Sequence, residues 1–365
     1  MKKKVISAIL CGAMVLGTVC PVLAADDKSE DTKTEAAAGD SAKGKKIALV
    51  GKAAGNAFFE IAAKSFQETV EAEGGEVQVV YPETATADAQ IKVLDNLISQ
   101  DFDAICISAN DVNALQAKLE EAMDEGIKVS SFDSAPNKDS REIFVNQAGT
   151  KEVAQALMDA VLDISGGEGQ FAILSATSQS ANQNAWIDAM KTIMEGDDKY
   201  SKLELVDVVY GDDEPQKSTD QTAALLQNYK DLKVICAPTT VGIAAAGEVL
   251  TQAKSDIKLT GLGLPSEMKN YMPATADDDE FSFVCPYMML WDVSHLGAST
   301  AAIQMAVQND GFDGSAGSTV DMEAWGEYEA ETFTAEDNGD GGTGVLTGQP
   351  YVFYKDNMAE WVDKL

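Results

Sequence analysis

Polar and aromatic side chains recur just after short apolar runs along this chain of 365 residues. Lys52 follows the first of these runs, and Asp133 follows the fourth. The helical pattern after Lys52 opens with three further candidates, Asn56, Phe58 and Phe59. A carboxylate accepts two hydroxyl hydrogen bonds, an amide both donates and accepts, and an aromatic face covers C–H surface. These residue types together favour the capture of a neutral polyol.

The later part of the chain repeats this arrangement. A polar loop, residues 175–184, leads into a helical pattern at Trp186. Pro238 and Thr240 follow another apolar run. In open parallel α/β sheets, ligands bind beyond the carboxyl ends of the strands, so we expect these residues to contribute to a ligand site.

Several of these residues have a purely structural alternative. An Asp after a strand is often the N-cap of the next helix, and we expect that role for Asp111, Asp212 and Asp213. The two phenylalanines could be simple core residues. Asp133 is different, because no strong helical pattern begins directly after it. It is therefore the strongest single candidate for ligand binding.

Few residues support a catalytic or metal-binding interpretation. Arg141 is the one arginine, so a guanidinium clamp for carboxylate or phosphate is not expected. His295 is the one histidine, which argues against a histidine-rich metal site and a Ser-His-Asp triad. Residues 336–341 faintly resemble a calcium loop, but Thr347 stands where the bidentate Glu is needed, so a turn is favoured. We expect a binding protein with no cofactor and no metal rather than an enzyme.

The first residues predict export from the cytoplasm. Lys2 to Lys4 form a basic head, residues 5–19 are apolar, and Ala24 supplies a small residue at a cleavage site. This layout is typical of a secretory signal, and the apolar run is too short for a stable membrane span. A lipid anchor on Cys20 is the alternative. The mature protein is expected in the periplasm or on the outer face of the cytoplasmic membrane.

Length and charge set further limits. About 320 residues remain after the leader and linker, which suggests two domains. Without the leader, 24 basic residues stand against 60 acidic ones, and the net charge is −36. Such a surface repels nucleic acid and anionic membranes, so neutral solutes or basic protein surfaces are the expected partners. Cys106, Cys236 and Cys285 lie in apolar runs without regular spacing, which indicates core thiols.

Short β-rich runs alternate with amphipathic helical stretches from Lys46 onwards. The expected strands are 47–51, 77–81, 104–108 and 128–132, then 171–175, 205–210, 234–237 and 259–262. Within each series the strands start about 24 to 34 residues apart, the length of a βαβ unit. Most are continuously apolar, as parallel strands covered on both faces should be. The predicted fold class is α/β, with two doubly wound parallel-sheet lobes.

We expect the chain to change lobes near residues 145–149. A β-rich run at 281–285 precedes a long helix at 293–308 that could return to the first lobe. The run 351–354 and a helix at 358–362 close the structure. The expected division is a signal peptide at 1–24, a flexible acidic linker at 25–45, a first lobe at 46–146 and 290–325, and a second lobe at 147–289 and 326–365.

Several stretches resemble the rhamnose-binding proteins of ABC importers. They are Lys52 to Phe59 (KAAGNAFF), Phe132 to Ser134 (FDS), Val145 to Gln147 (VNQ), Ile173 to Trp186 (ILSATSQSANQNAW), Val209 to Asp213 (VYGDD), Ala237 to Ala245 (APTTVGIAA) and Thr260 to Met268 (TGLGLPSEM). The related autoinducer-2 receptors share the same skeleton, and the stretch around Trp291 (LWDV) is closer to theirs. The resemblance covers nearly all of residues 46–365.

The resemblance implies a type I periplasmic binding fold, in which two lobes close on a ligand around a hinge. By position, Lys52, Asp133, Gln183 and Pro238 match binding residues of the autoinducer-2 receptors. On this basis the ligand is expected to bridge Asp133 and Lys52 of one lobe to Gln183 and the neighbouring Asn182 of the other.

The sequence departs from the related families at several positions. Asn182 stands where the autoinducer-2 receptors have Asp, Thr240 stands where they have Ala, and Phe132 replaces a usual Trp. Gly263 stands where ribose and galactose binders have a strand-end acid. With Leu264, it is expected to offer an apolar wall to the methyl group of a deoxy sugar.

The resemblance predicts a monomeric, extracytoplasmic solute-binding protein, not an enzyme, that delivers a neutral monosaccharide to the permease of an ABC importer. L-Rhamnose is the expected ligand, and autoinducer-2 or another pentose or hexose is the alternative. A sugar-responsive repressor core can share this fold. It needs a DNA-binding headpiece, however, where this chain has a leader and an acidic linker.

Overall fold

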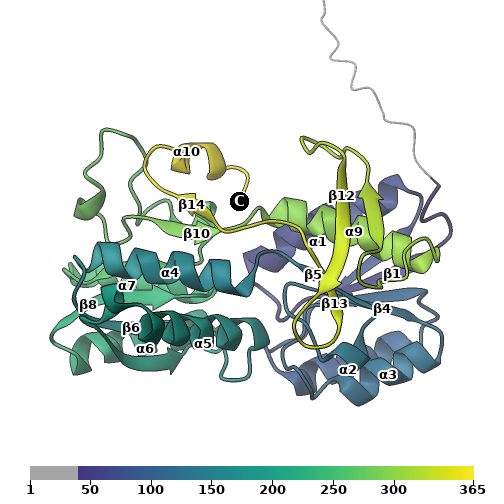
Figure 1. Ribbon diagram of the computed structural model, residues 1–365, viewed down its shortest axis with the longest axis horizontal. Helices are drawn as coiled ribbons and strands as arrows, with labels where there is room; N and C mark the ends of the chain where they lie inside the picture. Colours follow the sequence, from purple (N-terminus) through teal and green to yellow (C-terminus); the bar gives the residue numbers. More distant parts are fainter. Residues whose placement is uncertain (1–39) are drawn as a thin grey trace, which may run out of the picture. The chain divides into compact units, whose positions relative to one another are not determined.

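Two separate, mainly parallel sheets organise residues 40–365, the part of the chain that the computed structural model describes (Figure 1). The first sheet has the strand order β11-β12-β13-β5-β4-β3-β1-β2. Its strands are β1 (Lys46–Val50), β2 (Glu76–Val80), β3 (Ala104–Ile107), β4 (Lys128–Phe132), β5 (Ile143–Asn146), β11 (Thr319–Met322), β12 (Glu331–Asp337) and β13 (Thr343–Leu346). Strands β1 to β5 and β13 run parallel, whereas β11 and β12 are antiparallel additions at one edge.

The second sheet is entirely parallel and has the order β7-β6-β8-β9. Its strands are β6 (Gly169–Ser175), β7 (Leu203–Tyr210), β8 (Leu232–Ala237) and β9 (Lys258–Gly261). A small antiparallel pair, β10 (Met288–Leu290) with β14 (Tyr351–Phe353), adjoins β9 through a bridge between Leu262 and Met289. Each sheet is the centre of one lobe. The predicted α/β class with two doubly wound parallel-sheet lobes is confirmed.

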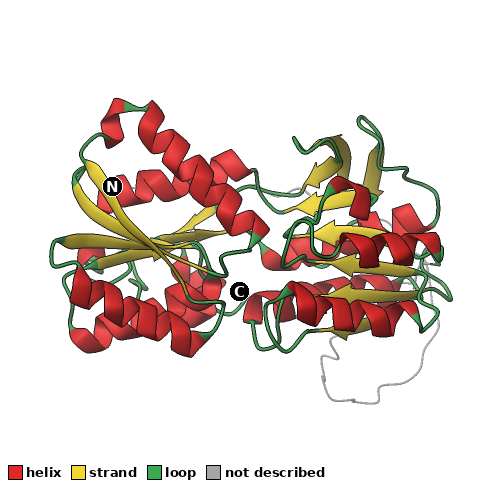
Figure 2. Cartoon of the chain, turned by 90° about the horizontal axis from the view of Figure 1, so that it is seen from below, coloured by secondary structure: helices red, strands yellow, loops and turns green. Residues whose placement is uncertain are grey.

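Helices cover both faces of each sheet (Figure 2). In the first lobe, α1 packs on α9 over one face, while α2 and α3 lie together on the other. In the second lobe, α4 packs on α5, and α6 packs on α7. The helices are α1 (Ala57–Ala72), α2 (Ala87–Ile98), α3 (Gln116–Asp124), α4 (Thr150–Ile164), α5 (Ala181–Gly196), α6 (Pro215–Asn228), α7 (Thr240–Ala253), α8 (Pro265–Met268), α9 (Val293–Gln308) and α10 (Met358–Trp361).

Local sequence explains why the helices that border the site begin where they do. Asn56 caps α1, because its side chain accepts a hydrogen bond from the Phe58 backbone N–H at 3.0 Å. Asp292 caps α9 in the same way, with His295 as the donor at 3.0 Å. The two helices approach closely at Gly297, where a Cβ atom would stand 2.2 Å from the Ala62 carbonyl oxygen. Glycine is therefore needed at that crossing.

The chain passes between the lobes three times. It crosses from β5 to α4, from β10 to α9 and from β13 to β14, and Figure 1 shows the last crossing in yellow. Residues 147–149, 291–292 and 347–350 form these crossings. The first crossing lies where the sequence predicted a change of lobe.

The structure differs from the sequence-based expectations in three segments. Residues 331–346 form β12 and β13, and β13 pairs with β5, so this segment extends the first sheet and not the second lobe as expected. Residues 281–285 form no strand, since residues 280–282 are a 3-10 turn and the strand follows at 288–290. The expected linker does not extend to residue 45, because Ala42 is 1% exposed and its backbone N–H donates to the Glu73 carbonyl at 3.0 Å.

The expected signal peptide at 1–24, the Cys20 alternative and most of the linker lie outside the described residues. Within residues 40–365, no helix is both long enough and apolar enough to cross a membrane.

Candidate functional site

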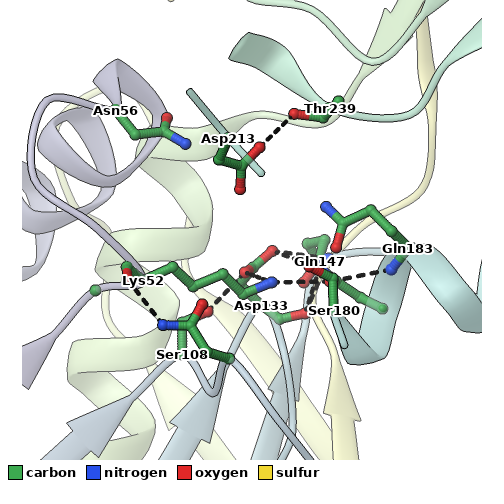
Figure 3. A network of polar contacts seen from close by, with 12 residues as sticks. Lys52, Asn56, Ser108, Asp133, Gln147, Ser180, Gln183, Asp213 and Thr239 are labelled. Carbon is green, nitrogen blue, oxygen red and sulfur yellow. Dashed lines mark hydrogen bonds and ion pairs between the residues drawn. The ribbon is translucent and has the colours of Figure 1, made fainter. Parts of the chain in front are cut away.

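Both lobes direct the carboxyl ends of their strands at one cavity (Figure 3). In the first lobe, Lys52 follows β1 and Asp133 follows β4. In the second lobe, Gln183 lies in the first turn of α5, and Pro238 follows β8. Trp291 comes from the crossing between β10 and α9. The arrangement agrees with the rule that open parallel sheets bind ligands beyond their strand ends.

Asp133 lies at the centre of a polar network that Figure 3 shows. Its φ angle is 59°, a left-handed conformation that few residues other than glycine adopt. The Ser108 hydroxyl donates to its Oδ2 at 2.7 Å. The Gln147 amide donates to its carbonyl oxygen at 3.2 Å and to its Oδ1 at 3.3 Å. Because Asp133 is only 5% exposed, these donors are needed to stabilise the buried carboxylate.

Direct contacts between side chains join the two lobes. Asn182 of α5 accepts a hydrogen bond from Lys52 Nζ at 2.8 Å and donates one to Asp133 Oδ1 at 3.2 Å. Lys52 Nζ lies 3.6 Å from Asp133 Oδ2, which adds an ion pair. On the other side of the cavity, the Thr240 hydroxyl donates to Asn56 Oδ1 at 3.4 Å. The lobes are therefore closed on each other.

A buried glutamine on α2 holds the ends of strands β1 and β3 together. Gln90, which is fully buried, donates to the carbonyl oxygens of Gly51 at 3.1 Å and Ser108 at 2.7 Å. Its Oε1 accepts from the Asn110 backbone N–H at 2.8 Å, and Asn110 in turn donates to the Lys52 carbonyl at 2.9 Å. One side chain thus holds the ends of β1 and β3 in register with each other.

The cavity brings together most of the residues that the sequence singled out. Its volume is about 40 Å³, room for a few water molecules in this closed arrangement. Its lining includes Lys52, Asn56, Phe58, Phe59, Asp133, Gln183, Trp186, Pro238, Thr240 and Trp291. Asn182 is not part of the lining and acts through its contacts with Lys52 and Asp133. Whether these residues bind a ligand stays a prediction.

An aromatic cluster forms the apolar side of the cavity. Phe58 and Phe59 pack edge to face at 5.2 Å, and Phe58 meets Trp291 at 6.1 Å. Trp186 of the second lobe lies 5.9 Å from Trp291, so the cluster spans both lobes. The two phenylalanines are about 5% exposed and belong to the core as well as to the cavity. Aromatic faces of this kind suit the C–H surface of a ring.

Two polar atoms of the lining have no partner among residues 40–365. Gln183 Oε1 is an acceptor without a donor, and Trp291 Nε1 is a donor without an acceptor. Their side chains are 8% and 4% exposed. Buried polar atoms are almost always hydrogen-bonded, so this donor and this acceptor are available to a hydroxyl-bearing ligand.

Asp213 lines the cavity, although the sequence favoured a capping role for it. The N-cap of α6 is Glu214, so the expected capping role was wrong for both Asp213 and Asp212. Asp213 has a φ of 53° and accepts a hydrogen bond from the Thr239 hydroxyl at 2.6 Å. The N-cap of α3 is Leu115, so the expected capping role was wrong for Asp111 as well; its side chain accepts from the backbone N–H groups of Asn113 and Ala114, both at 2.8 Å, in the turn before that helix.

The apolar wall of the cavity differs from the expected one. Leu262 and Leu290 line it, whereas Gly263 and Leu264 do not. Successive side chains of an extended segment point to opposite sides, so Leu262 faces the cavity and position 263 faces away. A Cβ atom at Gly263 would meet the Met288 sulfur at 2.5 Å. Nothing local in the sequence separates Leu262 and Leu290 from ordinary core leucines.

The other candidate groups are occupied elsewhere. Arg141 pairs with Asp340 at 2.7 Å, away from the cavity. His295 lies on α9, and its Nε2 is 3.0 Å from Glu331 Oε2. No cluster of three or more potential metal ligands occurs within residues 40–365.

The three cysteines of the described chain are free and buried, as expected. Burial raises the pKa of Cys106 and Cys236 to about 12, which keeps both thiols protonated.

Comparison with known proteins identifies the family to which this fold belongs. A family model described as a periplasmic binding protein domain matches residues 47–311. The chain belongs to the periplasmic binding protein family. An ABC transporter solute-binding protein from Clostridium phytofermentas, solved with bound L-rhamnose, is 47% identical. The match covers 88% of this chain and 99% of that one, with a TM-score of 0.83.

Other solved structures extend the comparison. A sugar ABC transporter protein from Actinomyces odontolyticus is 33% identical over 87% of this chain and 97% of its own, with a TM-score of 0.66. LsrB from Clostridium saccharobutylicum in complex with AI-2 is 20% identical, with 87% and 99% coverage and a TM-score of 0.77, and shows the shared fold. This periplasmic binding protein is therefore an extracytoplasmic solute-binding protein of an ABC transporter, not an enzyme.

The electrostatics of Asp213 generate a pH-dependent prediction. Burial raises the pKa of Asp213, although the Thr239 hydroxyl and the Lys52 charge partly oppose that shift. The folded state therefore keeps this proton at pH values where the unfolded chain, with an Asp pKa of about 3.9, has lost it. The free energy of unfolding should fall as pH rises from about 4 through the raised pKa. In Asp213→Asn this fall should be shallower, which urea denaturation at a series of pH values measures.

Thr239→Val should change the pH dependence of stability in the direction opposite to Asp213→Asn. The Thr239 hydroxyl stabilises the ionised carboxylate, so its removal should raise the pKa further and extend the fall to higher pH. Equal pH slopes in the wild type and both variants would contradict the effect of burial on Asp213.

Proposed function

We propose that this protein captures L-rhamnose between its lobes and delivers it to the permease of an ABC importer. One observation carries the proposal: the cationic group of the cavity is already paired, while neutral hydrogen-bonding atoms are not. Lys52 is engaged by Asn182 and Asp133. Gln183 Oε1 and Trp291 Nε1 lack partners among the described residues. A neutral polyol satisfies both atoms and adds no charge to a buried site.

The carboxylate geometry also favours hydroxyl groups. Asp133 has Ser108, Gln147 and Asn182 as donors, and ligand hydroxyls can take over the positions that Asn182 holds across the cleft. Charge-assisted hydrogen bonds of this kind are stronger than neutral ones. The aromatic cluster around Trp291 would cover the less polar face of the sugar ring.

An apolar wall supports a deoxy sugar in particular. Leu262 and Leu290 line the cavity and are 2% and 1% exposed. A methyl group against these leucines loses no hydrogen bond, whereas a hydroxymethyl group would bury an unpaired hydroxyl. The relative that is 47% identical, solved with bound L-rhamnose, agrees with this choice.

Ligand entry requires the lobes to separate. The closed cavity of about 40 Å³ is smaller than a sugar ring, and the contacts of Asn182 with Lys52 and Asp133 close it off. A sugar that replaces these contacts and adds its own would favour the closed arrangement over the open one.

A panel of related sugars tests the ligand. Isothermal titration calorimetry should show L-rhamnose binding about fivefold or more tightly than L-lyxose, which lacks the methyl group, because burial of that methyl group contributes roughly 1 kcal/mol or more. L-Mannose, which carries a hydroxymethyl group in place of the methyl group, should also bind more weakly. Tight binding of autoinducer-2 or of a phosphorylated or carboxylated solute, without L-rhamnose binding, would overturn the proposal.

Asp133→Ala tests the central carboxylate. Hydrogen bonds with a charged partner contribute about 1.5–3 kcal/mol, so the variant should bind L-rhamnose about 10 to 100 times more weakly. Asp188→Ala, at an exposed position of α5, is the control and should bind as the wild type does. If Asp133→Ala lost thermal stability but kept wild-type affinity, Asp133 would only brace the hinge.

We also propose that the leader is removed after Ala24 and that the mature protein is a monomer outside the cytoplasm. The basic head, the apolar run and the small residue at the cleavage site support this proposal. Mass spectrometry of the native protein should find a terminus near Ala25. An adduct of diacylglycerol on Cys20 would replace this cleavage site with a lipid anchor, and an intact Met1 terminus would exclude export.

A further inference from the structure

A second pocket lies where the chain crosses between the lobes. All three crossings contribute to it, through Gln147, Trp291 and the segment 347–349. Tyr351 and Trp361 add aromatic walls from the second lobe. We call this the hinge pocket. Its volume is about 180 Å³, compared with about 40 Å³ for the cavity in the cleft.

The hinge pocket offers an aromatic surface that is open to solvent. Tyr351 is 41% exposed, and its ring packs on Trp361 at a centroid distance of 5.4 Å and on Phe353 at 5.2 Å. Exposed aromatic side chains that line a concave surface are typical of binding sites, whereas isolated exposed residues are not. A ring with a C–H face would pack on this surface.

Two ionisable side chains of the lining, Asp292 and His295, already have hydrogen-bond partners within the protein. Asp292 accepts from the His295 backbone N–H and from the Tyr328 hydroxyl, each at 3.0 Å. The His295 ring nitrogen lies 3.0 Å from Glu331. No lysine or arginine of residues 40–365 lines the hinge pocket, so an anionic ligand would find no fixed cationic partner there, which favours a neutral ligand over an anionic one.

One buried acceptor in the hinge pocket lacks a donor. Gln147 is 1% exposed, and its Oε1 has no hydrogen-bond partner within residues 40–365. The amide of Gln349 and the hydroxyl of Thr347 supply further neutral polar groups. A hydroxyl-bearing ligand can exchange hydrogen bonds with Gln349 and Thr347. Aromatic faces with neutral amides and hydroxyls are the groups that recognise a saccharide ring.

The hinge pocket is connected to the cleft through two of its residues. Gln147 donates to Asp133 at 3.2 and 3.3 Å, and Trp291 lines both cavities. The walls also come from both lobes, since Thr347 follows β13 of the first sheet and Tyr351 begins β14 beside the second. A rotation that opened the cleft would change the distance between these walls.

We propose that the hinge pocket is a second saccharide site, which binds a neutral sugar ring and stabilises the closed arrangement of the lobes. An occupant that contacts walls from both lobes in the closed form favours that form. It therefore raises the affinity of the cleft, and by linkage a ligand in the cleft raises the affinity of the hinge pocket. Binding at the hinge pocket stands independently, while the coupling rests on the proposed sugar site in the cleft.

Tyr351→Ser tests the binding step, with Phe281→Ser as the matched control. Phe281 is 43% exposed, an exposure close to that of Tyr351, and does not line the hinge pocket. L-Rhamnose at millimolar concentration is the probe, and both changes are made in Asp133→Ala to weaken the cleft. Saturation-transfer NMR should show sugar bound to Asp133→Ala. Tyr351→Ser should weaken that binding about five- to tenfold by loss of the aromatic face, and Phe281→Ser should leave it unchanged.

A crystal of the wild type soaked in L-rhamnose gives the second measurement. Sugar density at Tyr351 and Gln147, in addition to the cleft, is the expected result. Density in the cleft alone, or equal binding by the Tyr351→Ser and Phe281→Ser variants, would overturn the second site. Density at the hinge pocket without any effect of Tyr351→Ser on solution binding would mean binding at crystal concentration only, which also overturns it.

The coupling has its own readout. With Asp133 intact, labelled L-rhamnose is chased from the cleft with unlabelled sugar at millimolar concentration, which fills the hinge pocket. The labelled sugar should leave about fivefold faster in Tyr351→Ser than in the wild type, and Gln349→Ala should act in the same direction. Unchanged release rates in both variants would overturn the coupling. Failure of the wild-type cleft to bind L-rhamnose would overturn the proposed function instead, and Tyr351-dependent binding would still decide the hinge pocket.

Discussion

The structure depends on how it stabilises one buried carboxylate at the meeting of two lobes. Asp133 is 5% exposed, and a charge in that position is tolerable only with several donors around it. Those donors come from distant parts of the chain: Ser108 from the end of β3, Gln147 from the first crossing, Lys52 from the end of β1 and Asn182 from the other lobe. Satisfying Asp133 therefore requires the strand ends, the hinge and the closed lobe arrangement together. The backbone of Asp133 also adopts a left-handed conformation, which is unfavourable for residues other than glycine and is held here by the surrounding contacts.

Apart from Asp213, which lines the same cavity, the remaining charged residues of the described chain lie outside the lining of the cleft. The chain is strongly acidic, with a net charge of −33 over its full length. Its single arginine, Arg141, is buried in the first lobe, where it holds the turn between β12 and β13 through Asp340. The cleft relies on one lysine, amides, hydroxyls and aromatic rings. A binding protein built in this way selects by hydrogen-bond geometry and apolar contact, because the net field of the surface does not attract anions.

The sequence predicted what depends on local pattern and missed what depends on long-range contacts. Continuous apolar runs identified the parallel strands, and polar residues after them identified Lys52 and Asp133. Strand β12 was missed because five of its seven residues are exposed and three are acidic, and it exists only through pairing with β11 and β13. Asp213 was taken for a helix cap because an Asp before a helix usually is one. The roles of Gln90 and Gln147 rest on partners 14 to 39 residues away, which no local pattern reveals.

The direct contact between Lys52 and Asn182 has a consequence for the transporter that this protein serves. The lobes can satisfy each other's polar groups across the cleft. A closed conformation therefore does not by itself show that solute is bound. A permease that recognised only the relative position of the lobes would accept empty carriers and waste ATP on them. Discrimination must then come from the lifetime of the closed form: a carrier that holds solute stays closed for longer than one held only by the contacts of Asn182 and Thr240 across the cleft. The residue at position 182 would in that case set the rate of ATP hydrolysis without transport as well as the affinity for the solute.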